Sequence, residues 1–295
     1  MLVKRNPKDR SQAPADGWEH RFSYVNNLRL HYVIQGKGPS VVLLHGWPES
    51  WYQWRFIIPA LAPQYTVIAP DLRGYGLSDK PAGPYDKRTM AADIHALVRS
   101  LGYQRIRLVG HDRGARVAHR YALDYPAEIE KLVIMDIVPT RIVFERLTAQ
   151  TAQAYWHWFF HLVPDLPEQL AGANVEAYLR HFFTAWAHNR ATFTPEVLAT
   201  YVRTYSAPGA LRAGFNDYRA GMMEDWPQDA QDAGRKVERP TLVLWGAESL
   251  ARVFDVLRVW REFAVDVRGQ AIPECGHFLP EEQPKLIVRK LLEFL

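Results

Sequence analysis

The 295-residue sequence has little of what several protein classes require. It contains one cysteine, which excludes a framework of intramolecular disulfides and a metal site built from several thiolates. Its apolar runs, such as Val41–Leu44, are far shorter than the ~20 residues that span a bilayer, and the first residues lack the apolar core of a secretory signal. The net charge is only +4 and its basic residues are scattered. We therefore expect a cytoplasmic protein that binds neither membranes nor nucleic acids.

Short apolar runs, each followed by turn residues, indicate a mostly parallel sheet. Residues 20–35 predict a hairpin that turns at Asn26-Asn27. Helical patterns at Thr89–Leu101 and Ala115–Leu123 separate several of the later runs, and buried strands that alternate with helices are typical of an α/β protein with helices on both faces of the sheet. The strands expected after the hairpin are Ser40–Leu44, Tyr65–Ala69, Ile106–Val109, Lys131–Met135, Thr241–Leu244 and Gln270–Pro273.

The composition changes near Pro139. Residues 140–232 have no strand pattern but many aromatic residues at helical spacing, interrupted by prolines. We expect this segment to be a helical cap, inserted into a core formed by residues 1–139 and 233–295. Because open α/β sheets bind ligands at the carboxyl ends of their strands, such a cap would cover the binding site.

The sequence Gly110-His111-Asp112-Arg113-Gly114 fits a nucleophile elbow, the strand–turn–helix motif G-x-Nu-x-G. Asp112 occupies the nucleophile position, where serine is usual, and no G-x-S-x-G occurs in the chain, which argues against a serine esterase. The N-terminus of the following helix favours an ionised carboxylate, which can form an ester intermediate. The alternative interpretation is that Asp112 only caps this helix.

Hydrolysis of an ester on Asp112 needs a base that activates water. His277 is the candidate, because it follows the last expected strand. The acid that orients it is expected to be Asp136, at the end of the strand after the elbow helix, and Glu248 is the alternative. We interpret Cys275 as a packed residue rather than a reactive thiol.

Two further features fit around this centre. His45-Gly46-Trp47-Pro48 follows a strand, so the backbone N–H groups of Trp47 and Arg113 are the expected oxyanion donors. Arg113 and Arg116 lie three residues apart at the start of the elbow helix, on neighbouring parts of one face. Two guanidinium groups beside the nucleophile predict a substrate with a carboxylate; the alternative is that they form structural ion pairs.

The motifs HGWP, DLRGYGLSDKP, GHDRGAR, MDIVPT, YWHW, DYRAG and CGHF occur in this order, and together they resemble the haloacetate dehalogenases of the α/β-hydrolase family, fluoroacetate dehalogenases in particular. The resemblance covers nearly the whole chain after about the first fifteen residues. It implies an α/β-hydrolase fold, the catalytic and carboxylate-binding roles given above, and a homodimer. It also implies a halide pocket in the cap formed by His157, Trp158 and Tyr218.

These features predict hydrolytic dehalogenation of haloacetates, including fluoroacetate, to glycolate and halide. We expect a small haloacid as substrate, no cofactor and no metal, because the pair His157 and His161 has no further ligand cluster. The main alternative is an epoxide hydrolase, which has the same Asp–His–Asp set and cap tyrosines that protonate the epoxide oxygen. A ligand-binding protein without activity is a third interpretation. The candidate tyrosines for the epoxide reaction are Tyr155, Tyr201, Tyr205 and Tyr218.

Overall fold

An eight-stranded sheet lies at the centre of the computed structural model, which describes residues 17–249 and 253–295. The strand order is β1-β2-β4-β3-β5-β6-β7-β8, with β2 antiparallel to β1 and β4 and all other neighbours parallel. This sheet confirms the predicted α/β class. The strands are β1 (His20–Val25), β2 (Leu28–Gln35), β3 (Ser40–Leu44), β4 (Thr66–Pro70), β5 (Ile106–His111), β6 (Ile129–Met135), β7 (Thr241–Gly246) and β8 (Val267–Ile272).

The local sequence explains how well each strand could be predicted. Asn26 and Asn27 have φ angles of 50° and 58°, as a type I′ hairpin turn requires. Every residue of β3 and β4 is buried, so each strand appears in the sequence as a continuous apolar run. The prediction for β8 was wrong by three residues at its start, because this edge strand is mostly half-buried or exposed and its apolar signal is weak.

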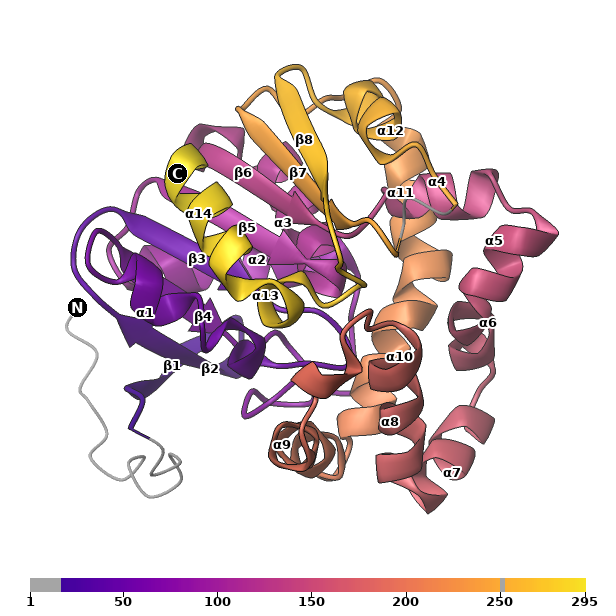
Figure 1. Ribbon diagram of the computed structural model, residues 1–295. Helices are drawn as coiled ribbons and strands as arrows, with labels where there is room; N and C mark the ends of the chain where they lie inside the picture. Colours follow the sequence, from indigo (N-terminus) through magenta and orange to yellow (C-terminus); the bar gives the residue numbers. More distant parts are fainter. Residues whose placement is uncertain (1–16, 250–252) are drawn as a thin grey trace.

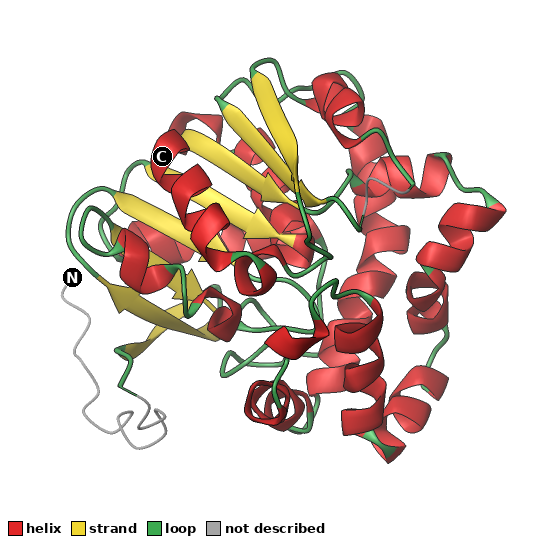
Figure 2. Cartoon of the chain, viewed as in Figure 1, coloured by secondary structure: helices red, strands yellow, loops and turns green. Residues whose placement is uncertain are grey.

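Helices cover both faces of the sheet (Figures 1 and 2). On β3, Val42 and Leu44 belong to a core cluster with α2, α3 and α12, whereas Val41 and Leu43 belong to a second cluster with α1 and α14. This alternation follows the two-residue period of a strand. The helices of this part are α1 (Ile58–Leu61), α2 (Lys87–Ser100), α3 (Asp112–Asp124), α12 (Val256–Phe263), α13 (Leu279–Glu282) and α14 (Pro284–Phe294), with short 3₁₀ turns η2 (Trp51–Trp54) and η3 (Pro126–Glu128).

The residues between β6 and β7 form helices that stand beyond the carboxyl ends of the strands (Figure 1). We call residues 140–232 the cap segment. A π-helical turn, η5 (Gly221–Asp225), joins α10 to α11, and such turns are frequent at functional sites. None of the helices in the described residues is long and apolar enough to cross a membrane. The other helices of the cap segment are α4 (Thr140–Glu145), α5 (Ala149–Ala154), α6 (Trp156–Leu162), α7 (Leu166–Ala173), α8 (Val175–Ala185), η4 (Arg190–Thr192), α9 (Pro195–Tyr205), α10 (Ala210–Ala220) and α11 (Trp226–Gln231).

Candidate active site

Asp112 stands at a sharp turn between β5 and α3, as the elbow motif predicts. Its φ angle is +47°, a left-handed conformation that is uncommon for a residue with a side chain. The flanking glycines are needed for close packing: a Cβ on Gly110 would lie 2.6 Å from the Cα of Ala115, and one on Gly114 would lie 2.4 Å from the carbonyl oxygen of His45. The turn therefore holds Asp112 at the carboxyl end of the sheet in a strained conformation.

The Asp112 carboxylate is poised in its ionised form. Burial alone would raise its pKa, but the nearby charges of His277 and Arg113 and a hydrogen bond from Trp47 hold the pKa below its usual value. The Trp47 N–H donates this bond to Asp112 Oδ1 over 2.9 Å. Asp112 and His277 keep 12% and 11% of their side-chain surfaces accessible, so both can be reached by a small molecule.

His277 lies between two aspartates. Its Nδ1 is 2.6 Å from Asp136 Oδ2, and its Nε2 is 3.8 Å from Asp112 Oδ2. Burial lowers the pKa of His277, but the hydrogen bond and charge of Asp136 and the charge of Asp112 outweigh it and raise the pKa to about 9. Asp136 itself accepts hydrogen bonds from the Gly246 N–H and the Ser249 hydroxyl. The carboxylate that orients His277 in this structure is thus Asp136, whereas the Glu248 side chain is exposed.

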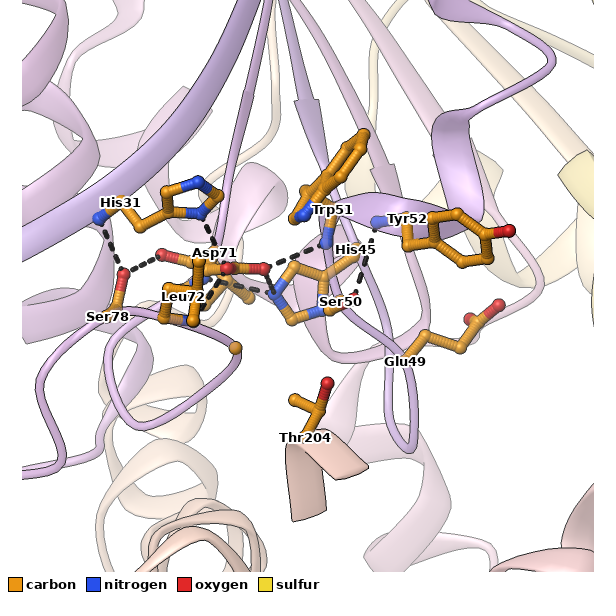
Figure 3. A network of polar contacts seen from close by, with 12 residues as sticks. His31, His45, Glu49, Ser50, Trp51, Tyr52, Asp71, Leu72, Ser78 and Thr204 are labelled. Carbon is orange, nitrogen blue, oxygen red and sulfur yellow. Dashed lines mark hydrogen bonds and ion pairs between the residues drawn. The ribbon is translucent and has the colours of Figure 1, made fainter. Parts of the chain in front are cut away.

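The loop that carries Trp47 is fixed by a buried polar network (Figure 3). Asp71 accepts hydrogen bonds from the Trp51 N–H over 2.9 Å and from His31 Nδ1 over 2.7 Å, and His45 Nε2 accepts one from the Leu72 N–H. The Trp47 N–H therefore points at Asp112 from a loop that is held by buried hydrogen bonds. That the backbone N–H groups of Trp47 and Arg113 act as oxyanion donors stays a prediction.

The side chain of Arg113 is paired with an aspartate of the cap segment. Its Nε donates to Asp217 Oδ1 over 3.0 Å, and its Nη2 donates to the same oxygen and to the Asp217 carbonyl oxygen. Asp217 comes from α10 and also accepts hydrogen bonds from Lys87 and from the Tyr75 hydroxyl. Two of the three Arg113 nitrogens thus form the structural ion pair that the sequence left open as the alternative, and binding of a substrate carboxylate by Arg113 stays a prediction. Only Nη1 has no hydrogen-bond partner among the described residues.

Arg116 is buried in a different way. Its Nη1 donates to the Val138 carbonyl oxygen and to the Thr140 hydroxyl, both over 3.0 Å. Its guanidinium carbon lies 4.7 Å from the centre of the Trp158 ring, and its Nε has no partner among residues 17–249 and 253–295. Burial and the like charge of Arg113 lower its pKa. Within the described chain no carboxylate lies within ion-pair distance of Arg116, although the more distant charge of Asp112 offsets part of the lowering of its pKa. Arg116 is therefore a buried cation without an ion-pair partner in the described residues.

The three residues expected to bind halide come together from two cap helices. His157 and Trp158 lie on α6 and Tyr218 on α10, and the Tyr218 ring is 5.6 Å from His157 and 5.8 Å from Trp158. Burial lowers the pKa of His157 well below its usual value and raises that of Tyr218 well above it. Both side chains are therefore neutral at pH 7 and keep a proton to donate. That they bind halide stays a prediction.

Of the tyrosines considered for epoxide opening, two have hydroxyl groups engaged elsewhere. Tyr201 donates to Glu281 Oε1 over 3.1 Å, and Tyr205 contacts the Glu49 carbonyl oxygen at 3.5 Å. Tyr155 is buried against Trp158, with ring centres 5.3 Å apart. In the described chain no group of three or more His, Cys, Asp or Glu side chains is arranged to hold a metal. Cys275 is fully buried in the apolar core.

Sequence reasoning missed the acidic partner of Arg113. Asp217 lies in the motif DYRAG directly before Tyr218, but its partners Lys87 and Arg113 are 130 and 104 residues away. The sequence did contain a local signal. Asp217 lies on the buried face of a helix, and a buried carboxylate needs a cation as its partner. The sequence does not show which cation it meets.

A mostly parallel sheet with a strained aspartate elbow, a histidine and a second aspartate defines an α/β hydrolase. Residues 39–284 match the family model of the alpha/beta hydrolase fold, and the chain belongs to that family. The soluble epoxide hydrolase of Corynebacterium sp. (strain C12) is 42% identical over 279 residues, which cover 93% of this chain and 96% of that protein. The fluoroacetate dehalogenase of Burkholderia sp is 39% identical over 288 residues, which cover 95% and 94%.

Solved structures agree with this assignment. The crystal structure of ALR0039 from Nostoc sp PCC 7120 matches with a TM-score of 0.92 at 44% identity, and the match covers 94% of this chain and 98% of that one. Because a named epoxide hydrolase and a named dehalogenase are almost equally similar to the chain, identity alone does not separate these two reactions. The chain is a hydrolase of the α/β-hydrolase family.

Proposed function

We propose that the protein hydrolyses haloacetates, including fluoroacetate, to glycolate and halide. The observation that carries this proposal is Arg116. A buried cation without a counterion is costly, because desolvation is not repaid by an ion pair. An anionic substrate would supply the missing charge beside Asp112, and the free Nη1 of Arg113 would provide a second donor to its carboxylate. A neutral epoxide offers Arg116 no charge.

In the proposed reaction Asp112 attacks the halogen-bearing carbon of the bound haloacetate. The carbon–halogen bond breaks, halide leaves with the bonding electrons, and a glycolyl ester remains on Asp112. His157, Trp158 and Tyr218 would stabilise the departing halide by donating hydrogen bonds. Fluoride needs this most, so these donors must bind the developing anion more tightly than the intact carbon–fluorine bond.

The ester is then hydrolysed. His277, oriented by Asp136, takes a proton from water as the water oxygen attacks the ester carbonyl carbon of Asp112. The Trp47 N–H, already within 2.9 Å of Asp112 Oδ1 in the resting enzyme, stabilises the oxyanion that forms. Collapse of this intermediate breaks the ester bond. The departing alkoxide takes up a proton and leaves as glycolate, the Asp112 carboxylate is restored, and one proton is released to solvent for each ester cleaved. We propose no cofactor or metal for either step.

Epoxide hydrolysis is the second candidate, and two observations favour it. Tyr218 and His157 are both neutral donors beside the nucleophile, and either could protonate an epoxide oxygen as Asp112 opens the ring. The pairing of Arg113 with Asp217 also makes the site less positive than two free arginines would. Either reaction would form an ester on Asp112. A haloacetate would lose its halide and give a glycolyl ester, whereas an epoxide would keep its oxygen as a hydroxyl group and give a hydroxyalkyl ester.

The deciding experiment is an ion-selective assay of halide release from fluoro-, chloro- and bromoacetate, with styrene oxide as the neutral substrate. We expect halide release at a rate set by the enzyme concentration. In His277→Asn, mass spectrometry should find a glycolyl adduct on the peptide that contains Asp112, and Asp112→Ala should release no halide. Turnover of styrene oxide without halide release from any haloacetate would reject the dehalogenase in favour of the epoxide hydrolase.

A further inference from the structure

The buried charges next to the site are nearly balanced. Asp217 and Arg113 are both fully buried, and Lys87 is almost so. Asp217 Oδ1 accepts from both cations, while its Oδ2 accepts from the Tyr75 hydroxyl over 2.6 Å. Asp225 is a second acid here, since it accepts from the Lys87 N–H and its Oδ2 lies 3.3 Å from Lys87 Nζ. Two acids therefore face the two cations Arg113 and Lys87.

Arg116 forms no ion pair with these two acids, although it lies close to Arg113. Both guanidinium groups lie near the Trp158 ring, with their central carbons 5.3 Å and 4.7 Å from its centre. Two like charges against one ring repel each other, and the Arg113 charge contributes to the lowered pKa of Arg116. Because Asp217 neutralises Arg113, the net positive charge presented to a ligand comes from Arg116.

We propose that Asp217 is a specificity-determining residue, which limits the positive charge of the carboxylate subsite so that Arg116 binds a single small carboxylate. The proposal rests on the proposed function in one respect, namely that the ligand bears a carboxylate. It extends that function because it assigns unequal roles to the two arginines. Arg116 provides the charge, and Arg113 acts as an oriented donor through Nη1.

Asp217 has a second, positional effect that a test must separate from its charge. It is followed directly by Tyr218, whose ring lies 4.4 Å from the Arg113 guanidinium carbon. Losing the Asp217 contact could therefore displace both Tyr218 and Arg113. Lys87 makes the separation feasible, because its Nζ contacts the same carboxylate oxygen but carries the opposite charge. A charge effect changes sign between Asp217 and Lys87 variants, whereas loss of positioning does not.

The experiment compares Asp217→Asn, Lys87→Met and the double variant. Isothermal titration measures the Kd of acetate and of neutral acetamide, and halide release measures KM for chloroacetate. We expect Asp217→Asn to tighten acetate binding roughly five- to tenfold and Lys87→Met to weaken it by a similar factor, as expected for a unit charge several ångströms away. The double variant should return near the wild-type Kd. Acetamide binding should stay within about twofold in all three.

A matched control removes an exposed acid near the same charges. Glu224 is exposed on η5 directly before Asp225, so Glu224→Gln should leave the acetate Kd unchanged. If both single variants weaken acetate, or if acetamide changes in parallel with acetate, Asp217 acts by position alone and the proposal is rejected. If Asp217→Asn does not fold, as circular dichroism will show, the double variant decides: it must bind acetate more tightly than Lys87→Met.

The results also distinguish this proposal from the proposed function. Halide release by the wild type together with same-direction shifts rejects the role of Asp217 and leaves the dehalogenase standing. Opposite shifts in acetate binding without halide release from any haloacetate support the role of Asp217 and reject the dehalogenase. A wild type that neither binds acetate nor turns over chloroacetate rejects both.

Discussion

The charge of Asp112 should raise the pKa of His277. In the proposed two-step reaction, His277 would therefore become a base only after Asp112 has formed the ester. The pKa of His277 is about 9 in the resting structure: burial lowers it, and Asp136 and Asp112 raise it. Most of the imidazole is therefore protonated at pH 7 and cannot act as a base. Once Asp112 becomes an ester it loses its charge, so the pKa of His277 falls and the base becomes available. Replacing Asp112 by Asn imitates this loss of charge.

The size of the fall follows from the geometry. His277 Nε2 lies 3.8 Å from Asp112 Oδ2. For an effective dielectric constant of ~20 to ~40, two unit charges at this distance interact by ~2–4 kcal/mol, which corresponds to ~1.5–3 pKa units. The pKa of His277 should thus fall from about 9 in the wild type to roughly 6–7.5 in Asp112→Asn. The Asp136 contact is unchanged and keeps the value from falling further.

The assay is a pH titration of histidine side chains by NMR in the wild type and in Asp112→Asn. His277→Asn identifies the resonance that belongs to His277. In the wild type the same mechanism predicts that the ester on Asp112 accumulates below pH ~6, because a protonated His277 cannot activate water. Rapid quenching and mass spectrometry would detect it. Equal pKa values of His277 in the two proteins would refute the coupling.

Four other outcomes are expected. Thr140→Val should raise KM for chloroacetate about threefold or more by releasing Arg116, whereas Thr140→Ser keeps the hydroxyl and should not. Asp71→Asn should lower the free energy of unfolding in urea by about 3 kcal/mol, since Asp71 accepts from Trp51 and His31. Gly114→Ala should destabilise by more than about 2 kcal/mol in the same assay, because its Cβ would meet backbone oxygens at 2.4 Å. Light scattering should give twice the chain mass of 34.0 kDa if the homodimer prediction is right.

Each of these results has a contrary outcome. A similar loss in Thr140→Val and Thr140→Ser would mean that size rather than the hydroxyl positions Arg116. Unchanged urea unfolding of Asp71→Asn would show that the network around the Trp47 loop is dispensable. A Gly114→Ala protein of wild-type stability would contradict the close packing of α3 against β3. A monomer by light scattering would reject the homodimer.

The fold and the elbow that carries Asp112 could be predicted because their signals are local. Each central strand is a continuous run of buried residues, and the elbow glycines surround Asp112 within five consecutive positions. The sequence identified Asp136 and Glu248 as candidate acids because both follow strands. It could not show which of them reaches His277, because that distance depends on backbone geometry. Asp136 reaches it from a left-handed conformation with φ of +52°, which no sequence pattern displays.

The partner of Arg113 depends on contacts between distant segments. Two arginines at the start of α3 look equivalent in the sequence because their spacing places them on one face. The fold makes them different: α10 brings Asp217 to Arg113, whereas Arg116 donates its hydrogen bonds to the neutral oxygens of Val138 and Thr140. A sequence pattern shows how many charged residues lie near the site. Which of these charges can interact with a ligand depends on the ion pairs that form in the fold.

This difference also explains why the reaction class is harder to infer than the mechanism. In the proposed mechanism Asp112, His277 and Asp136 would form and cleave an aspartyl ester whether the substrate loses halide or opens an epoxide ring. Discrimination must come from the groups opposite the nucleophile. There the hydroxyls of Tyr201 and Tyr205 are engaged elsewhere, which weakens protonation by a tyrosine pair, and the unpaired charge of Arg116 favours a carboxylate. If Arg116→Met reduced the turnover of styrene oxide as much as that of chloroacetate, Arg116 would stabilise the fold rather than bind the substrate carboxylate. The proposal of a haloacid substrate would then lose its main support.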